Sequence, residues 1–464
     1  MLLGRTGDAC AETQDRPRPP NVLLIVSDDQ RPDTIGALGN DRIQTPNLDR
    51  LVRQGTAFTR AVVPNPICTC SRAELLSGCT GFRNGVVGSS SRLDPGLVLW
   101  PQAMRSRGYR TCYVGKWHLA GAPKTHGYEA TDGLYAGGSR LPPTVPRDFA
   151  GRDVTGYVGW AFRDDEGKTL PEFGVGLTAD ISRRFADAAI RQIERKDERP
   201  FFLHVNFTAP HDPLIVPPGY AERAKPGRAA LPENFLARHP FDHGNFDGRD
   251  ERLFAWPRTA EMVRAELACY YAVIEAMDEQ IGRILAALDA TGQAGETLVI
   301  FTSDHGLAIG SHGLRGKQNM YEHTIGVPLL MRGPRIPAGR RIDAQCYSRD
   351  LYPTVCELAG IAVPESVEGR SLLPAIDGKT AEIRPFTVGY FLDVQRMIRT
   401  DRWKLICYPR IGRMQLFDLA ADPFELHDLA AEPDRRETIA ELRGKLAAWQ
   451  REHGDALELP PLLK

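Results

Sequence analysis

Short continuous apolar runs alternate with amphipathic segments along most of the chain. Runs such as Asn21–Val26 and Phe201–Phe207 show little polar alternation, which is typical of strands buried on both faces of a sheet. Segments such as Ala179–Glu194 and Glu261–Thr291 instead repeat their apolar residues with a helical period. Strands that alternate with helices predict an α/β fold, with a large, mostly parallel sheet flanked by helices, and we assign it to residues 21–380.

Four of the expected strands are followed by charged or ionisable side chains. Ligands of such sheets bind outside the carboxyl ends of the strands, so the fold would gather these side chains at one edge although they lie far apart in the sequence.

The remaining expected elements are the strands Tyr109–Val114, Thr297–Thr302 and Val327–Met331 and the helices Thr45–Gln54, Trp100–Arg107 and one that opens at Arg72–Leu76.

The pattern changes after about residue 380. Short strand-like runs separated by turn residues follow, and then Glu437–Glu452 has a helical period. We therefore expect residues 381–464 to form a C-terminal subdomain with a small antiparallel sheet and a covering helix. Residues 132–175 and 213–258 are rich in turn residues and are expected to be irregular surface insertions.

Composition and charge bear on the class of function. The chain has 464 residues, of which 42% are hydrophobic and 25% charged, and its net charge is −1. These are ordinary globular values, and the balance does not favour binding to nucleic acid or to an anionic membrane surface. No window reaches the roughly 18 apolar residues of a membrane span. The sequence leaves the oligomeric state open.

The cysteines and the N-terminus bear on location. Nine cysteines form no disulfide framework, and several lie in apolar strand-like runs, which favours free thiols and a reducing compartment. Residues 1–20 are expected to be a flexible lead-in without the apolar stretch of roughly 7–15 residues found in a signal peptide. We therefore expect a cytoplasmic protein, or a periplasmic or secreted one if the start is misassigned.

Two segments carry candidate chemistry. Cys68 stands just before an expected helix, with Arg72 four residues on. A helix N-terminus favours anions, and a cysteine placed there can be an activated nucleophile or its precursor. A buried thiol beside a surface arginine explains that segment equally well. In the second segment, Lys116 and His118 follow a strand, and a solvated lysine would explain that segment alone.

Together the two segments resemble the sulfatase family of the alkaline-phosphatase-like superfamily. The first is similar to the signature C-x-P-S-R-x-x-L-L-T-G, and the second matches every specified position of G-Y-x-T-x-x-x-G-K-x-H. Asn21–Asp29, and Thr302–Gly306 with Gly316-Lys317, resemble the metal-binding strands of the family. Trp403–Leu405 and Leu416–Leu419 extend the resemblance to the C-terminal part, so it covers nearly the whole chain.

The resemblance implies one divalent cation, held by Asp28, Asp29, Asp304 and His305. Three carboxylates and one imidazole suit a hard ion, so Ca²⁺ is expected, with Mg²⁺ or Mn²⁺ as alternatives. An acidic pair after a strand can also cap a helix. Asp304 and His305 stand together at the end of another expected strand, and this second group of ligands favours metal binding.

The resemblance also implies a nucleophile. In the family, a maturation enzyme oxidises the cysteine to formylglycine, whose hydrated aldehyde is a gem-diol. One hydroxyl attacks the sulfur of the ester, and the other then loses a proton and expels sulfate. The implied catalytic residues are Cys68 as the nucleophile, Arg72 to orient the diol, Lys116 and Lys317 to bind sulfate, His118 to take the proton and His211 to protonate the leaving oxygen. Asp212, His312 and Asn319 are candidate substrate contacts, although a purely structural histidine is an equal interpretation of His312.

Cys70 is the main departure from the family, because it stands where the signature has proline. The maturation enzyme reads the local peptide, so conversion of Cys68 depends on the maturation system of the host. A second thiol two residues from Cys68 could also form a strained disulfide or a metal-binding pair.

The resulting hypothesis is an arylsulfatase-like sulfuric ester hydrolase. It would convert an aryl or sugar sulfate to the alcohol and inorganic sulfate, with a formylglycine-generating enzyme as its maturation partner. A phosphonate monoester or phosphodiester hydrolase with the same site is one alternative. An inactive sulfatase-like binding protein that retains the Cys68 thiol is the other.

Overall fold

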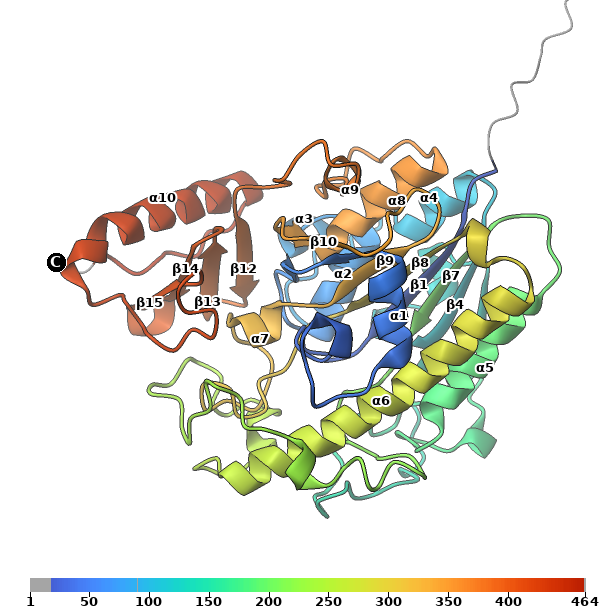
Figure 1. Cartoon of the computed structure of the whole chain (residues 1–464), viewed down its shortest axis with the longest axis horizontal. Helices are drawn as coiled ribbons and strands as arrows, with labels where there is room; N and C mark the ends of the chain where they lie inside the picture. Colours follow the sequence, from blue (N-terminus) through green and yellow to red (C-terminus); the bar gives the residue numbers. More distant parts are fainter. Residues whose placement is uncertain (1–17, 90, 463–464) are drawn as a thin grey trace, which may run out of the picture.

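The computed structural model describes residues 18–89 and 91–462, so most of the lead-in predicted for residues 1–20 lies outside the described residues. A nine-stranded sheet forms the centre of this part of the chain (Figure 1). Its strands, in spatial order, are β10 (Arg340–Ile342), β2 (Thr56–Phe58), β9 (Leu329–Arg332), β8 (Thr297–Ser303), β1 (Asn21–Ser27), β7 (Phe201–Asn206), β4 (Arg110–Lys116), β5 (Ala130–Ala136) and β6 (Ala161–Arg163). The strands from β8 to β5 run parallel, whereas β9 and β6 pair antiparallel with their neighbours. The expected mostly parallel sheet is confirmed.

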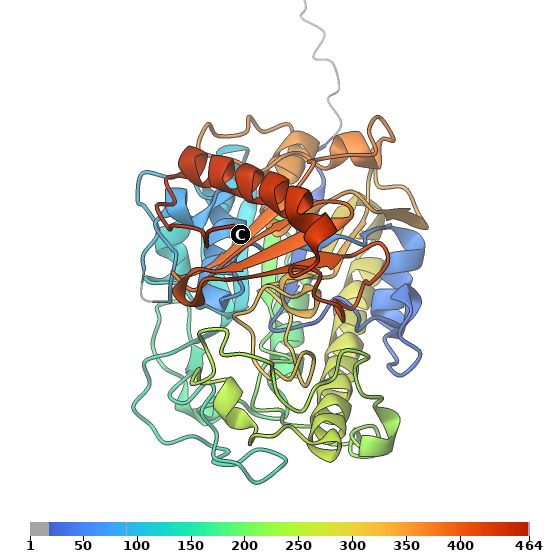
Figure 2. The ribbon, with the colours of Figure 1, turned by 90° about the vertical axis from the view of Figure 1, so that its left-hand side faces the viewer.

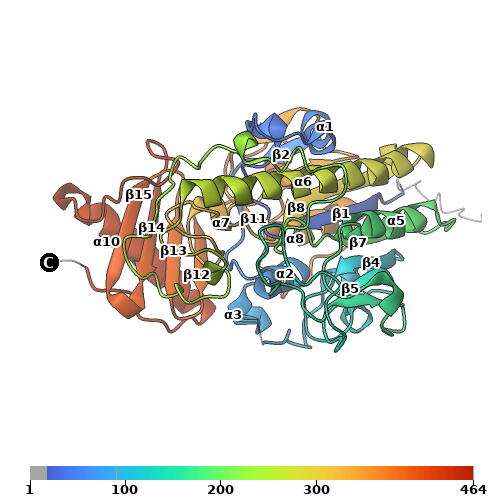
Figure 3. The same cartoon turned by 90° about the horizontal axis from the view of Figure 1, so that it is seen from below.

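The central strand β1 is apolar on both faces because helices cover both. Leu23 and Ile25 pack on one side, and Val22, Leu24 and Val26 pack on the other. Figure 3 shows α6 and α2 on opposite sides of the sheet. The first side is covered by α1 (Pro46–Gln54), α5 (Ile181–Glu194) and α6 (Ala260–Ala290), and the second by α2 (Cys68–Ser77), α4 (Trp100–Ser106), α8 (Leu351–Ala359) and α9 (Leu373–Ile376).

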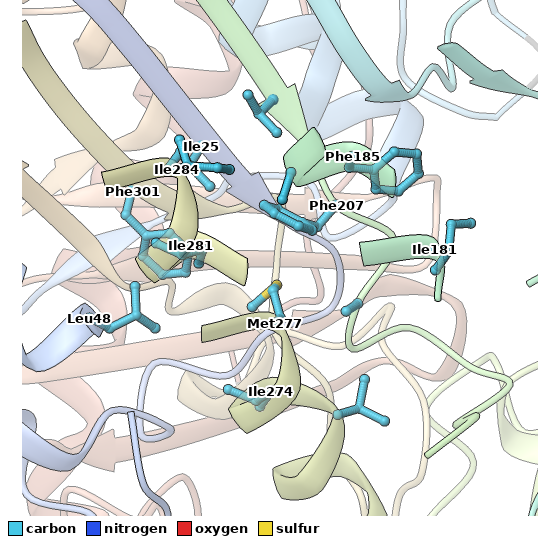
Figure 4. Close-up of a cluster of buried hydrophobic side chains, with 14 of the residues drawn as sticks. Ile25, Leu48, Ile181, Phe185, Phe207, Ile274, Met277, Ile281, Ile284 and Phe301 are labelled. Atoms are coloured by element: carbon cyan, nitrogen blue, oxygen red, sulfur yellow. The ribbon is translucent and has the colours of Figure 1, made fainter. Parts of the chain in front are cut away.

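The long helix α6 supplies much of the core on the first side. Ile281 and Ile284 lie near Ile25 and Phe301 of the sheet (Figure 4). The helix begins after Thr259, whose hydroxyl accepts a hydrogen bond from a backbone N–H of the first turn and so caps the helix. Complete burial of one such aliphatic side chain contributes about 1.5–3 kcal/mol, so this cluster holds the helix against the sheet.

A second, four-stranded antiparallel sheet follows near the C-terminus. It consists of β12 (Thr387–Phe391), β13 (Gln395–Arg399), β14 (Trp403–Tyr408) and β15 (Arg413–Asp418), and α10 (Arg436–His453) lies across it (Figure 2). One face packs on Leu442, Leu446 and Trp449 of α10, as the sequence predicts. The opposite face packs against Cys70 and Ala73 of α2. The domain boundary near residue 380 stays a prediction.

Two expectations about local structure were wrong. Helix α2 begins at Cys68, not at Arg72, and all of its residues are buried, so it has no polar face to reveal a helical period. The insertion 132–175 contains the end of β5 and all of β6, which is too short to show a strand pattern.

The shorter elements are β3 (Ala61–Val62), β11 (Cys346–Tyr347), α3 (Gly81–Asn84) and α7 (Glu322–Ile325). Within the described ranges, no helix has the length and apolarity needed to cross a membrane.

Candidate active site

Four neighbouring parallel strands deliver polar side chains to one edge of the main sheet. In spatial order β8 is followed by Asp304, β1 by Asp28, β7 ends at Asn206 and β4 ends at Lys116. Because these strands run parallel, their carboxyl ends lie side by side. All four side chains are buried. The predicted gathering of residues distant in sequence is therefore observed.

Cys68, the first residue of α2, lies within this group. Its Sγ is 3.3 Å from Nε2 of His305, 3.3 Å from Nζ of Lys317 and 3.9 Å from Oδ1 of Asp29. Burial raises the pKa of the Cys68 thiol, but the charges of Lys116, Lys317 and His305 outweigh it and hold that pKa well below the ordinary value. The surroundings of the thiol thus favour negative charge at this position.

Asp29 connects the cluster through both its backbone and its side chain. Its φ of +67° is left-handed, a conformation that aspartate tolerates better than most residues, and its N–H donates to Oδ1 of Asp304 at 3.0 Å. Its two carboxylate oxygens accept hydrogen bonds from Lys317 at 2.8 and 3.0 Å. Nδ1 of His305 lies 3.3 Å from Oδ1 of Asp29. Three of the four predicted metal ligands, Asp29, Asp304 and His305, are therefore in direct contact through Asp29.

Asp28 is surrounded by donors. Nζ of Lys116 donates to its Oδ2 at 2.5 Å, and the hydroxyl of Tyr157 donates to the same oxygen. Burial raises the pKa of Asp28, but Lys116 and other nearby cations hold it below the ordinary value. Tyr157 comes from the insertion 132–175, and no signal in the sequence pointed to it.

Arg72 is held in place by three groups from different strands. Its Nε donates to Oδ2 of Asp304 at 3.1 Å, its Nη1 to Oδ1 of Asn206 at 2.5 Å and its Nη2 to Oδ1 of Asp28 at 3.4 Å. Asn206 was not among the residues predicted from the sequence, although a polar residue that ends a buried strand is a signal that could have identified it.

Gly115, the glycine before Lys116 in the second signature, lies where β4 and β7 approach closely. Its φ is +91°, and a Cβ at this position would lie 2.0 Å from the backbone oxygen of Asn206. A side chain would therefore push β4 away from β7 and displace Lys116 from Asp28.

Two histidines flank the cluster. Nε2 of His211 is 3.8 Å from Oδ2 of Asp29, and although burial lowers the pKa of His211, Asp29 raises it above the ordinary value. Burial lowers the pKa of His118, whose hydrogen bond with Cys68 opposes that effect. One imidazole therefore favours its charged form and the other its neutral form, as an acid and a base would require.

The three candidate substrate contacts lie in different surroundings. Asp212 follows His211 and accepts a hydrogen bond from Nη1 of Arg249 at 2.9 Å. Asn319 donates to the carbonyl of Gly316 at 3.3 Å and so stabilises the loop of Lys317. His312 stacks on Tyr321 with ring centroids 3.8 Å apart, and its described contacts include none with Cys68 or the metal ligands predicted above. In the structure His312 therefore packs against Tyr321 and, among the described residues, does not contact the predicted site.

The carboxylates fit a divalent cation. Ligand atoms of Asp29, Cys68 and His305 lie within 4.8 Å of one another, and so do those of Asp28, Cys68 and Asp304. Burial, reinforced by the charge of Asp28, raises the pKa of Asp304 to about 7. A bound cation relieves this crowding of acidic groups, and oxygen donors suit a hard ion.

Cys70 faces away from the cluster. It packs in the apolar cluster that joins α2 to the second sheet, and burial raises the pKa of its thiol. All described cysteines are free, so Cys68 and Cys70 form no disulfide here. Cys70 contributes to the core and not to the candidate site.

Comparisons with known proteins agree with this geometry. The sulfatase family model matches residues 20–361, and a model of the C-terminal part of N-sulphoglucosamine sulphohydrolase matches residues 310–452. An arylsulfatase of Clostridium perfringens is 30% identical over 91% of this chain and 93% of its own. The crystal structure of the phosphonate monoester hydrolase of Agrobacterium radiobacter has a TM-score of 0.77 and 25% identity, with 94% and 96% of the two chains covered. A structure in complex with D-glucosamine-2-N,6-O-disulfate is 23% identical, with a TM-score of 0.76 over 95% of this chain and 99% of the other, and shows the same fold. The sequence-based recognition was correct, and the chain belongs to the sulfatase family.

Proposed function

We propose that this protein hydrolyses a sulfate ester to an alcohol and inorganic sulfate, with a nucleophile made from Cys68. The observation that carries the proposal is the position of Cys68, in the first turn of α2 and 3.3 Å from Nζ of Lys317, beside the buried Asp cluster. A helix N-terminus and buried cations stabilise an anionic substrate and the negative charge that develops on it.

The side chains around Cys68 have complementary tasks. Lys116 and Lys317 are buried ammonium groups that bind sulfate oxygens. Arg72, fixed by its contacts to Asp304 and Asn206, orients the nucleophile. His211 holds a proton for the leaving alcohol oxygen, and His118 accepts a proton when sulfate leaves.

Two groups complete the site in this proposal. Asp28, Asp29, Asp304 and His305 hold one divalent cation, with Ca²⁺ favoured, and the cation supplies Lewis acidity toward sulfate and nucleophile. Formylglycine, made from Cys68 by a maturation enzyme, supplies a hydroxyl nucleophile when its aldehyde is hydrated. The residues of the chain then bind the ester, exclude water and move protons.

The test is sulfate release by protein whose formylglycine content has been measured. Conversion of Cys68 lowers the mass of its tryptic peptide by about 18 Da. Converted protein should release sulfate from an aryl sulfate such as 4-nitrophenyl sulfate or from a sugar sulfate. Converted, metal-loaded protein that releases none from a panel of both classes would contradict the proposal.

A second candidate function is hydrolysis of phosphonate monoesters or phosphodiesters. The likeness to a phosphonate monoester hydrolase over nearly the whole chain favours it. Both reactions use tetrahedral anionic groups and the same positive side chains. Values of kcat/KM for 4-nitrophenyl sulfate, 4-nitrophenyl phenylphosphonate and bis(4-nitrophenyl) phosphate, measured on one preparation, distinguish the two. Retention of the Cys68 thiol in the native host would instead support the inactive binding protein.

A further inference from the structure

A cavity of about 520 Å³ lies beside the catalytic cluster. Its wall includes Thr69, the residue after Cys68, and His118. The other walls come from the chain after β4, the end of β5, and the segment that holds Trp160 and Arg163. The volume falls within the roughly 300–1,000 Å³ typical of small-molecule sites. We call this cavity the Trp160 pocket.

Aromatic rings connect the pocket to both histidines of the site. The ring of Trp160 lies 5.1 Å from that of His118, nearly perpendicular to it, and 5.1 Å from that of Tyr157. Tyr157 in turn lies 4.9 Å from His211. An alcohol whose oxygen is near either histidine therefore reaches an aromatic wall, and such walls bind planar or ring-shaped groups.

The charge of the pocket is positive and unbalanced. None of the described residues that line it is Asp or Glu, and Arg163 is its only Lys or Arg. Arg163 donates to the backbone oxygens of Gly167 at 3.0 Å and Gly137 at 2.5 Å, and it forms no ion pair with any residue in the described ranges. A guanidinium without a carboxylate partner at the edge of a cavity favours an anionic ligand group.

We propose that the Trp160 pocket binds the alcohol moiety of the ester and selects a ring alcohol that carries a second anionic group. The ring packs on Trp160, and Arg163 binds the additional carboxylate or sulfate. This inference rests on the proposed sulfatase function. Tryptophan rings can also bind quaternary ammonium groups, but Arg163 and the lack of lining carboxylates in the described pocket disfavour a cationic alcohol such as choline.

The experiment compares three esters, namely 4-nitrophenyl sulfate, 4-sulfooxybenzoate and choline-O-sulfate. Because 4-nitrophenol is the more acidic leaving group, the wild-type comparison is made on KM, which should be lower for 4-sulfooxybenzoate than for the other two esters. Arg163→Gln should lower kcat/KM for 4-sulfooxybenzoate about tenfold more than for 4-nitrophenyl sulfate, whereas Arg163→Lys should retain most of the preference. Trp160→Ala should raise KM for both ring substrates by about 10–100-fold.

The matched control is Arg147→Gln. Arg147 lies in the same insertion, but it is exposed and pairs with Asp153 at the surface. Arg147→Gln should leave the ratio of kcat/KM for 4-sulfooxybenzoate to kcat/KM for 4-nitrophenyl sulfate unchanged. Equal losses on all three esters in Arg163→Gln and Arg163→Lys would show that Arg163 only holds the carbonyls of Gly137 and Gly167, and would overturn the proposal.

A binding measurement separates this inference from the proposed function. Isothermal titration of Cys68→Ala protein with 4-sulfooxybenzoate needs no formylglycine, and Arg163→Gln in that background should weaken binding about tenfold. If wild-type protein releases no sulfate from any ester, the proposed function fails. If it releases sulfate but neither Arg163→Gln nor Trp160→Ala changes selectivity or binding, only the inference about the pocket fails.

Discussion

Nζ of Lys317 lies 3.3 Å from Sγ of Cys68 and also donates to both carboxylate oxygens of Asp29. One buried ammonium thus connects the proposed nucleophile to the proposed metal ligands. Because Lys317 contacts both Cys68 and Asp29, a change at the nucleophile should affect the metal ligands, and a change at the metal ligands should affect the nucleophile. Variants that alter only one of the two are therefore informative.

Cys68→Ala should abolish sulfate release and leave the fold intact. The side chain lies among Lys317, His305 and Asp29 and not in the apolar core. We expect a change in the free energy of unfolding of about 1 kcal/mol or less. Sulfate release and thermal unfolding of the same preparation check both parts. A variant with an appreciable share of the wild-type rate would falsify the role given to Cys68.

Cys70→Pro should fold and increase the fraction of Cys68 that is converted. Cys70 is the third residue of α2, where the backbone N–H has no intrahelical partner, so proline removes no helical hydrogen bond there. The change also restores the residue of the family signature. Mass spectrometry of the Cys68 peptide measures conversion.

Cys70→Ala is the control for this change. It removes the thiol from the apolar cluster without restoring proline, and should retain activity with a loss of about 1 kcal/mol in stability. A loss of activity in converted Cys70→Ala would show that the second thiol has a role in the site.

Asn206→Ala should lower kcat about 10–100-fold with a smaller effect on KM. Asn206 accepts from Nη1 of Arg72 at 2.5 Å, so its loss removes one of the three contacts that orient the guanidinium and leaves only those to Asp304 and Asp28. Steady-state kinetics on an aryl sulfate is the measurement. Asn40→Ala, which removes an amide that donates to the carbonyl of Asp33 in an exposed loop, is the control. Equal effects of the two changes would exclude the positioning role.

Calcium should raise the melting temperature, and a chelator should reverse that change. The buried carboxylates of Asp28, Asp29 and Asp304 repel one another, and a ligand that binds only the folded state at about 100 times its Kd stabilises by about 2.7 kcal/mol. Differential scanning fluorimetry with Ca²⁺, Mg²⁺, Mn²⁺ and EDTA measures the shift. In Asp304→Asn the shift should be much smaller, and an undiminished shift would place the cation elsewhere.

Acid should destabilise the protein through its buried histidines. Burial lowers the pKa of His204, His243 and His312 to about 3 and that of His239 to about 4. The unfolded chain binds protons near pH 6.5 while the folded chain does not, so stability is lost as pH falls below that value. Each such histidine costs about 2 kcal/mol at about pH 5.

Urea unfolding at about pH 7.5 and about pH 5 checks this dependence. His243, whose Nδ1 lies 3.2 Å from Nε2 of Gln395, provides the variant. His243→Asn should lose less stability between the two pH values than the wild type does, even if it is less stable at both. An unchanged difference would mean that His243 does not contribute to the acid sensitivity.

Much of the fold and part of the site could be predicted from the sequence. Apolar runs without alternation identified the buried strands, and parallel strands place their carboxyl ends together. That rule is enough to bring Asp28, Lys116 and Asp304 to one edge, as the structure has them. The second sheet and its covering helix were also readable, because their turns and helical period are local.

Other features were decided only by tertiary packing. The hydrogen bond from Arg72 to Asn206 joins residues 134 positions apart, and Tyr157 reaches Asp28 from an insertion without a period. The packing of Cys70 away from Cys68 and the stacking of His312 on Tyr321 depend on how the second sheet packs against α2 and α7. A local pattern encodes which face of an element is buried, whereas the partner of each side chain depends on elements that meet only after folding. The sequence alone therefore determined the family, the sheet and the residues at its edge, and the tertiary structure decided which groups hold Arg72 and Asp28 and which cavity adjoins Cys68.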